Sequence, residues 1–204
     1  MVTGPAPALS IVDYYLTPVL LEELLPINLG VMSAKQETMI SALGSPQLPL
    51  TTHDQPARAS ALVQKLMVEK LLGSHVQAKG IRPAVASLED VLQRVFDQEA
   101  AAGRNLASVL QDDGMIAVRY RKPTVGPPST KISNHAWGTA IDFRILGHDP
   151  PGNTHSLVPR FIAVLLPFFN AAGWYSGIGF SDSMHFEVAD GTIHKWAAEG
   201  AFKA

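Results

Sequence analysis

The apolar residues in the first half of the chain recur mainly at the spacing of amphipathic helices. This spacing is clearest between Ala59 and Leu72, where Gly73 is expected to end the helix. Ser87 and Asp90 resemble a capping box at the start of a later helix. The helices expected in this half are Leu16–Leu25, Ala59–Leu72 and about Leu88–Ala101.

The second half of the chain has the shorter, alternating pattern of strands. From Thr139 to Ile145, apolar side chains alternate with positions that include Asp142 and Arg144. Strands are therefore expected at Ile116–Arg121, Thr139–Ile145 and Met184–Ala189. Helices are expected at Val158–Ala172, where Pro167 would kink or split the helix, and at His194–Phe202. This layout predicts an α+β fold: a small antiparallel sheet covered by helices, with a mainly helical N-terminal half.

Length and composition are those of a globular protein. The chain has 204 residues, of which 47% are hydrophobic and 17% are charged. We expect a helical N-terminal region, residues 1–110, packed on a core of residues 111–204 as one compact unit. The net charge of -2, with 16 basic and 18 acidic residues, does not indicate a nucleic-acid partner. There is no cysteine, so metal ligands would have to be His, Asp or Glu.

The N-terminal sequence does not resemble a standard export signal. Residues 11–25 are fairly apolar, but Asp13, Glu22 and Glu23 interrupt them and no basic segment precedes them. The stretch is also too short and too charged to span a bilayer. The expectation is a soluble chain without a membrane span.

Two short segments contain most of the residues that could carry out chemistry, Ser133–Asp142 and Asp182–Glu187. A catalytic zinc site needs about three nitrogen or oxygen ligands and one open position for water. Asp142 and His185 would point into the same cleft if their two strands were neighbours in one sheet. His135, just before the first strand, could then complete the set, although the spacing alone does not prove this geometry.

Further polar residues could complete a hydrolytic site. Asp182 lies three positions before His185, where it could accept a proton from a metal-bound water and return it to a leaving amine. Arg119 and Arg121 occupy alternate positions, so both could present a guanidinium to one face. Such a group could bind a substrate carboxylate or stabilise an oxyanion.

Both segments resemble motifs of a known family. The run SNHAWGTAID is similar to the Ser-x-His-x-x-Gly-x-Ala-x-Asp signature of the D-alanyl-D-alanine carboxypeptidase family, and DSMHFE is similar to its second motif. That family includes VanY-type carboxypeptidases and phage L-alanyl-D-glutamate endolysins. It belongs to a zinc superfamily with lysostaphin-type peptidases and hedgehog domains. The resemblance covers roughly Ile116–Asp190.

The resemblance implies a zinc peptidase that cuts the peptide stems of peptidoglycan. It implies zinc ligands at His135, Asp142 and His185, a catalytic carboxylate at Asp182, and a substrate arginine at Arg119 or Arg121. Many carboxypeptidases of the group carry Glu at the position of Asp182, so the Asp is more similar to the endolysin branch. Because the N-terminal sequence does not resemble an export signal, we expect such a peptidase to remain in the cytoplasm until it is released or exported to the cell wall.

Several alternatives stay open at this stage. Glu187 could orient a metal ligand or form a surface salt bridge, Ser133 could contact substrate or begin a turn, and Asp182 could cap a turn. The sequence does not choose between carboxypeptidase and endopeptidase activity, and it does not predict an oligomeric state. A non-catalytic, hedgehog-like zinc-binding domain is the alternative of a different class. The presence of Asp182 argues against it, because a structural site needs no base.

Overall fold

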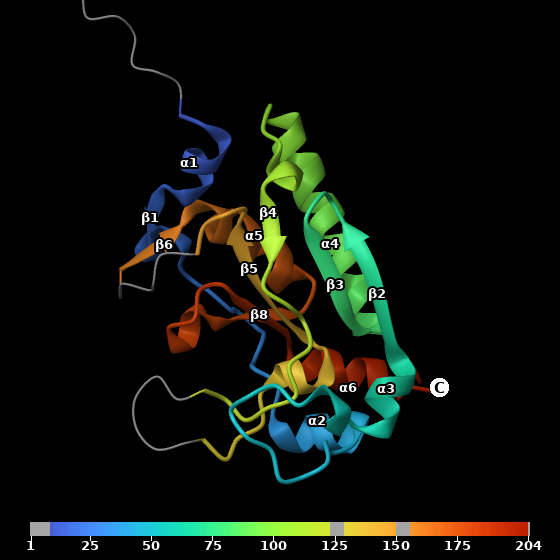
Figure 1. Cartoon of the computed structure of the whole chain (residues 1–204). Helices are drawn as coiled ribbons and strands as arrows, with labels where there is room; N and C mark the ends of the chain where they lie inside the picture. Colours follow the sequence, from blue (N-terminus) through green and yellow to red (C-terminus); the bar gives the residue numbers. More distant parts are fainter. Residues whose placement is uncertain (1–8, 123–128, 150–155, 204) are drawn as a thin grey trace, which may run out of the picture.

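A computed structural model describes residues 9–122, 129–149 and 156–203 (Figure 1). The helices are α1 (Ile11–Leu16), α2 (Gln36–Leu43), α3 (Ala61–Leu66), α4 (Arg82–Ala101), α5 (Arg160–Ala171) and α6 (Asp190–Ala198). The strands are β1 (Pro18–Leu20), β2 (Met67–Leu72), β3 (Val76–Ile81), β4 (Leu110–Asp112), β5 (Ala140–Ile145), β6 (Leu157–Pro159), β7 (Trp174–Ser176) and β8 (His185–Val188). The predicted α+β class is confirmed.

A four-stranded antiparallel sheet with the order β4-β5-β8-β7 forms the centre of the fold. One face of this sheet packs on α5, where the ring of Phe169 lies 5.7 Å from Phe143 and 4.4 Å from Phe186. These three rings are fully buried. The apolar face predicted for the segment around Asp142 is therefore the core face, which leaves the opposite face of β5 and β8 for polar side chains.

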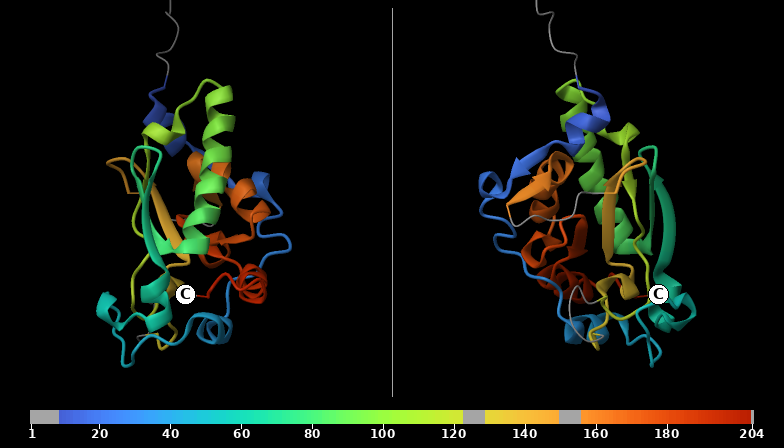
Figure 2. Two further views of the ribbon diagram at one scale, coloured as in Figure 1. Left: turned by 90° about the vertical axis from the view of Figure 1, so that its right-hand side faces the viewer. Right: turned by 60° about the vertical axis from the view of Figure 1, so that its left-hand side comes forward.

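A β-hairpin and α4 cover another side of the molecule (Figure 2). In the hairpin, β2 pairs with β3 in antiparallel register. The single helix predicted over Ala59–Leu72 is wrong in its second half, because Met67–Leu72 is strand β2. Local spacing alone favoured a helix, but pairing with β3 satisfies the backbone of β2, and Gly73 adopts the positive φ of +60° that the turn requires.

Three other predictions of local structure are corrected. Leu16–Leu25 does not form one helix: Pro18 lacks a backbone N–H, and its segment instead forms β1, which pairs with β6. Ser87 is not a cap, because α4 begins at Arg82 and the Ser87 hydroxyl accepts a hydrogen bond from Trp174 Nε1. The terminal helix spans Asp190–Ala198 and so begins and ends earlier than predicted.

The segment Ile116–Arg121 is not a regular strand. Its only strand-like contact among the described residues is an isolated bridge between Tyr120 and Ile132. The N–H of Val118 donates to the Asp54 side chain, whereas that of Tyr120 donates to the carbonyl of Thr51. Because its hydrogen bonds go to several different segments, no continuous ladder forms.

A hydrogen-bonded group of Tyr15, Glu99 and Arg104 links the N-terminal helix α1 to the end of α4. Glu99 is 1% exposed and accepts two hydrogen bonds from the Arg104 guanidinium, at 2.6 and 2.8 Å. The hydroxyl of Tyr15 donates to the same carboxylate at 2.7 Å. The bidentate arginine contact holds the pKa of the Glu99 carboxyl below its usual value despite burial.

Candidate metal centre

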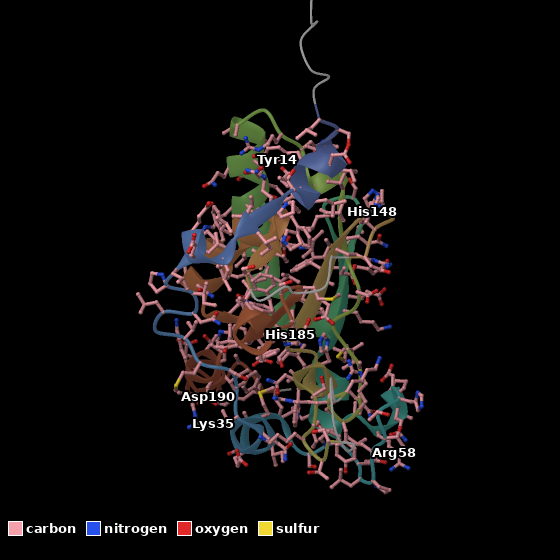
Figure 3. All side chains as sticks on the ribbon, turned by 90° about the vertical axis from the view of Figure 1, so that its left-hand side faces the viewer. Tyr14, Lys35, Arg58, His148, His185 and Asp190 are labelled. Atoms are coloured by element: carbon pink, nitrogen blue, oxygen red, sulfur yellow. The ribbon has the colours of Figure 1, made fainter. Side chains whose placement is uncertain are left out.

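A cleft of about 500 Å³ is lined by all the catalytic, substrate-binding and metal-ligand candidates predicted from the sequence. They are Arg119, Arg121, Ser133, His135, Asp142, Asp182 and His185. Glu187 also lines this cleft. The cleft lies over the polar face of the central strands, and the labelled His185 marks its place in the middle of the molecule (Figure 3).

The pairing of β5 with β8 brings two of the candidate ligands together. Asp142 lies directly opposite His185 in this antiparallel pair, so both side chains leave the same face of the sheet. His135 comes from a short 3-10 helix, Asn134–Trp137, that precedes β5. Gly138 ends this turn with a φ of +63°, and a Cβ there would lie 3.0 Å from the backbone of Gly80. The backbones of Gly138 and Gly80 therefore approach too closely for a side chain at position 138.

The three side chains converge on one point. The Nδ1 atom of His185 lies 2.8 Å from Asp142 Oδ1 and 3.2 Å from His135 Nε2. The distance from His135 Nε2 to Asp142 Oδ1 is 3.3 Å. Ligands about 2.0–2.1 Å from a tetrahedral zinc ion would lie about 3.3 Å from one another. The donor set and its spacing therefore fit a zinc ion, with the cleft side open to a fourth ligand.

The remaining ring nitrogens of both histidines are held by acceptors. His135 Nδ1 lies 3.2 Å from the carbonyl oxygen of Met115, and His185 Nε2 lies 3.0 Å from Glu187 Oε2. Each acceptor favours a proton on the nitrogen that faces it. The other nitrogen of each ring then directs its lone pair toward Asp142, as metal coordination requires.

Glu187 is an internal residue, 2% exposed, so its interpretation as part of a surface salt bridge is wrong. Besides His185, its carboxylate accepts hydrogen bonds from the Ser33 hydroxyl and from Asn134 Nδ2, the latter at 2.7 Å. These bonds keep the pKa of Glu187 below its usual value, although burial alone would raise it. Neither Ser33 nor Asn134 was predicted from the sequence as a site residue. Asn134 adjoins His135, but nothing in the sequence connects Ser33 with the motifs.

Electrostatics at the three convergent groups favour positive charge. Burial alone would raise the pKa of the Asp142 carboxyl, but the His135 and His185 imidazoles hold that pKa far below its ordinary value. Burial alone would likewise lower the pKa of His185, but the carboxylates of Asp142 and Glu187 raise it. A site that stabilises a proton on buried imidazole in this way also suits a metal cation, which would replace that proton.

Asp182 lies in the turn before β8, beside the convergent groups. Its backbone N–H donates to the carbonyl of Gly177, and its carbonyl accepts from the N–H of His185. A Cβ at Gly177 would collide with the carbonyl oxygen of Asp182, so the turn needs glycine there. Burial raises the pKa of the Asp182 carboxyl, whereas the charges of His185 and Arg119 oppose that rise. A carboxyl with a raised pKa suits proton transfer near neutral pH.

Both candidate arginines line the cleft, and their surroundings differ. Arg119 lines the same cleft as Asp182, and its charge opposes the rise that burial causes in the pKa of the Asp182 carboxyl. Arg121 lines a second hollow as well as the cleft, and its Nε donates to the carbonyl of Ile132 at 3.3 Å. Ser133 is 6% exposed at the cleft wall.

We expect Glu187→Gln to weaken zinc binding by about 10- to 100-fold, because the amide no longer supplies the charge that orients His185. Competition with a chelator of known affinity would measure the change. Glu199→Gln, an exposed substitution at the end of α6, is the matched control and should leave the affinity unchanged. Equal zinc affinity in the Glu187 and Glu199 variants would show that Glu187 does not support the ligand.

Comparison with known proteins agrees with this geometry. Residues 127–188 match the model of a family described as D-alanyl-D-alanine carboxypeptidase. No curated protein and no solved structure matches the chain significantly. Among the described residues, no helix is both long and apolar enough to cross a membrane. The matched segment holds both motifs and the three convergent side chains, so this segment of the chain is similar to the D-alanyl-D-alanine carboxypeptidase family.

Proposed function

We propose that the protein is a zinc metallopeptidase that hydrolyses an amide bond in the peptide stems of peptidoglycan. The observation that carries the proposal is the convergence of His135, Asp142 and His185 in a cleft that also contains Asp182. The family match supports a peptidase of this class. In this proposal residues 111–204 supply the catalytic core, with residues 1–110 packed on it.

The side chains of the cleft suggest a division of roles. A bound zinc ion would polarise the scissile carbonyl and lower the pKa of a water molecule. Asp182 would accept the proton of the attacking water and return it to the leaving amine. Arg119, whose charge acts on Asp182, would stabilise the negative charge that develops on the carbonyl oxygen. Ser133 and Arg121 would hold the substrate at the cleft wall.

We expect zinc-loaded protein to cleave a purified stem peptide, and a chelator to abolish the cleavage. Mass spectrometry of the products would identify the bond. Loss of terminal D-alanine would identify a carboxypeptidase, and a cut between L-alanine and D-glutamate would identify an endopeptidase. If no stem peptide gave a chelator-sensitive product, the proposed activity would be wrong, and a non-catalytic zinc-binding domain would become the better explanation.

A further inference from the structure

A second hollow of about 370 Å³ adjoins the candidate metal centre. Arg121 lines both spaces, so the hollow lies next to the cleft. Its wall also includes Lys35, Glu37 and Lys131. We call it the basic hollow. Figure 3 shows Lys35 beside Asp190 and below His185, one of the residues that line the cleft.

Positive side chains outnumber negative ones in the wall of the basic hollow. Three cationic side chains face one carboxylate, that of Glu37. Lys35, Arg121 and Lys131 form no ion pair in residues 9–122, 129–149 and 156–203. The other residues of the chain include neither Asp nor Glu. Lys35 lies near the Asp190 carboxylate, which accepts a hydrogen bond from the Lys35 backbone N–H, so Arg121 and Lys131 are the cations most available to an external anion.

Two features make the basic hollow more suitable for an anion than an ordinary exposed lysine would be. Arg121 is half-buried, and a partly desolvated guanidinium without a carboxylate partner is unfavourable until an anion pairs with it. The first turn of α2 also contributes to the wall, and no side chain caps this helix. The positive end of the helix dipole therefore adds to the charge of the three cations.

We propose that the basic hollow is a subsite for a second carboxylate of an acidic peptide substrate, bound beside the scissile bond. This inference rests on the proposed function and specifies its substrate class. Arg121 offers a planar fork that matches a carboxylate, and the two lysines add positive charge on flexible stems. A peptide with a single carboxylate would use the cleft alone, whereas a peptide with two would occupy both spaces.

Equilibrium titration with small peptides tests the subsite directly. The probes are the dipeptide L-alanyl-D-glutamate, which has two carboxylates, and each of its two monoamides. Zinc-loaded protein with Asp182→Ala is used so that no probe is turned over, and the buffer has low ionic strength to limit screening. We expect the dicarboxylate to bind on the order of tenfold more tightly than either monoamide, since one charge-assisted contact is lost in each. Equal affinities for the three probes would overturn the inference.

The double variant Lys35→Gln/Lys131→Gln is made in the Asp182→Ala protein. In this variant we expect the ratio of the affinity for the dicarboxylate to the affinity for either monoamide to fall to near one. Lys65→Gln is the control, because Lys65 is exposed on α3, away from both spaces, and forms no ion pair with the described residues. An undiminished preference in the double variant would also overturn the inference. The chelator assay on stem peptides is a separate experiment, so loss of the binding preference and absence of hydrolysis are distinguishable results.

Discussion

Asp182→Ala is expected to lower kcat/KM for a stem peptide on the order of 10³-fold while the protein keeps its zinc. The alanine cannot accept the proton of the attacking water or return it to the leaving amine. Zinc should remain because the three convergent donors are His135, Asp142 and His185. The two measurements are the rate of product formation and the zinc content of the purified variant, determined by elemental analysis.

Asp182→Asn is the matched variant, because it keeps the shape of the side chain and removes only its ability to accept a proton as a carboxylate. It should be nearly as inactive as the alanine variant. Full activity in either variant would show that another group acts as the base. Loss of zinc from either variant would instead move Asp182 from a catalytic role to a role in metal binding.

Asp142→Ala is expected to abolish detectable activity through loss of the metal itself. The Asp142 carboxylate is 2.8 Å from His185 Nδ1 and 3.3 Å from His135 Nε2, so it supplies both a ligand atom and the negative charge between two imidazoles. Removal of a ligand should cost more than the 10- to 100-fold in affinity that is typical of a supporting residue. Chelator competition measures the affinity, and the peptide assay measures the activity.

Added zinc distinguishes the loss of metal expected in Asp142→Ala from the loss of a proton acceptor expected in Asp182→Ala. An excess of zinc should partly restore activity to the Asp142 variant, since two histidines remain, but it should not restore activity to the Asp182 variant. A circular dichroism spectrum checks that each variant is folded. Wild-type zinc affinity in the Asp142 variant would exclude this carboxylate as a ligand.

Strand and helix predictions succeeded where a segment buries one continuous apolar face. Thr139–Ile145 alternates because one side of β5 packs on Phe169 of α5, and the structure has β5 at Ala140–Ile145. The helix predicted at Val158–Ala172 is also present, as α5 at Arg160–Ala171 with Pro167 inside it. Ile116–Arg121 has a similar local pattern, but within the described part of the chain it forms only the isolated bridge between Tyr120 and Ile132, so the strand prediction failed. Local periodicity does not report which backbone groups will find partners.

The sequence by itself determined the motifs, the residue types and the spacing that predict a metal site at His135, Asp142 and His185. It also determined that the two strands could carry these side chains on one face. Only the tertiary structure decided that Asp142 and His185 are cross-strand partners, and that Glu187 is buried against Ser33. It alone placed the basic hollow beside the cleft. These contacts join positions far apart in the chain, and they follow from strand register and helix packing, which a local pattern of residues does not encode.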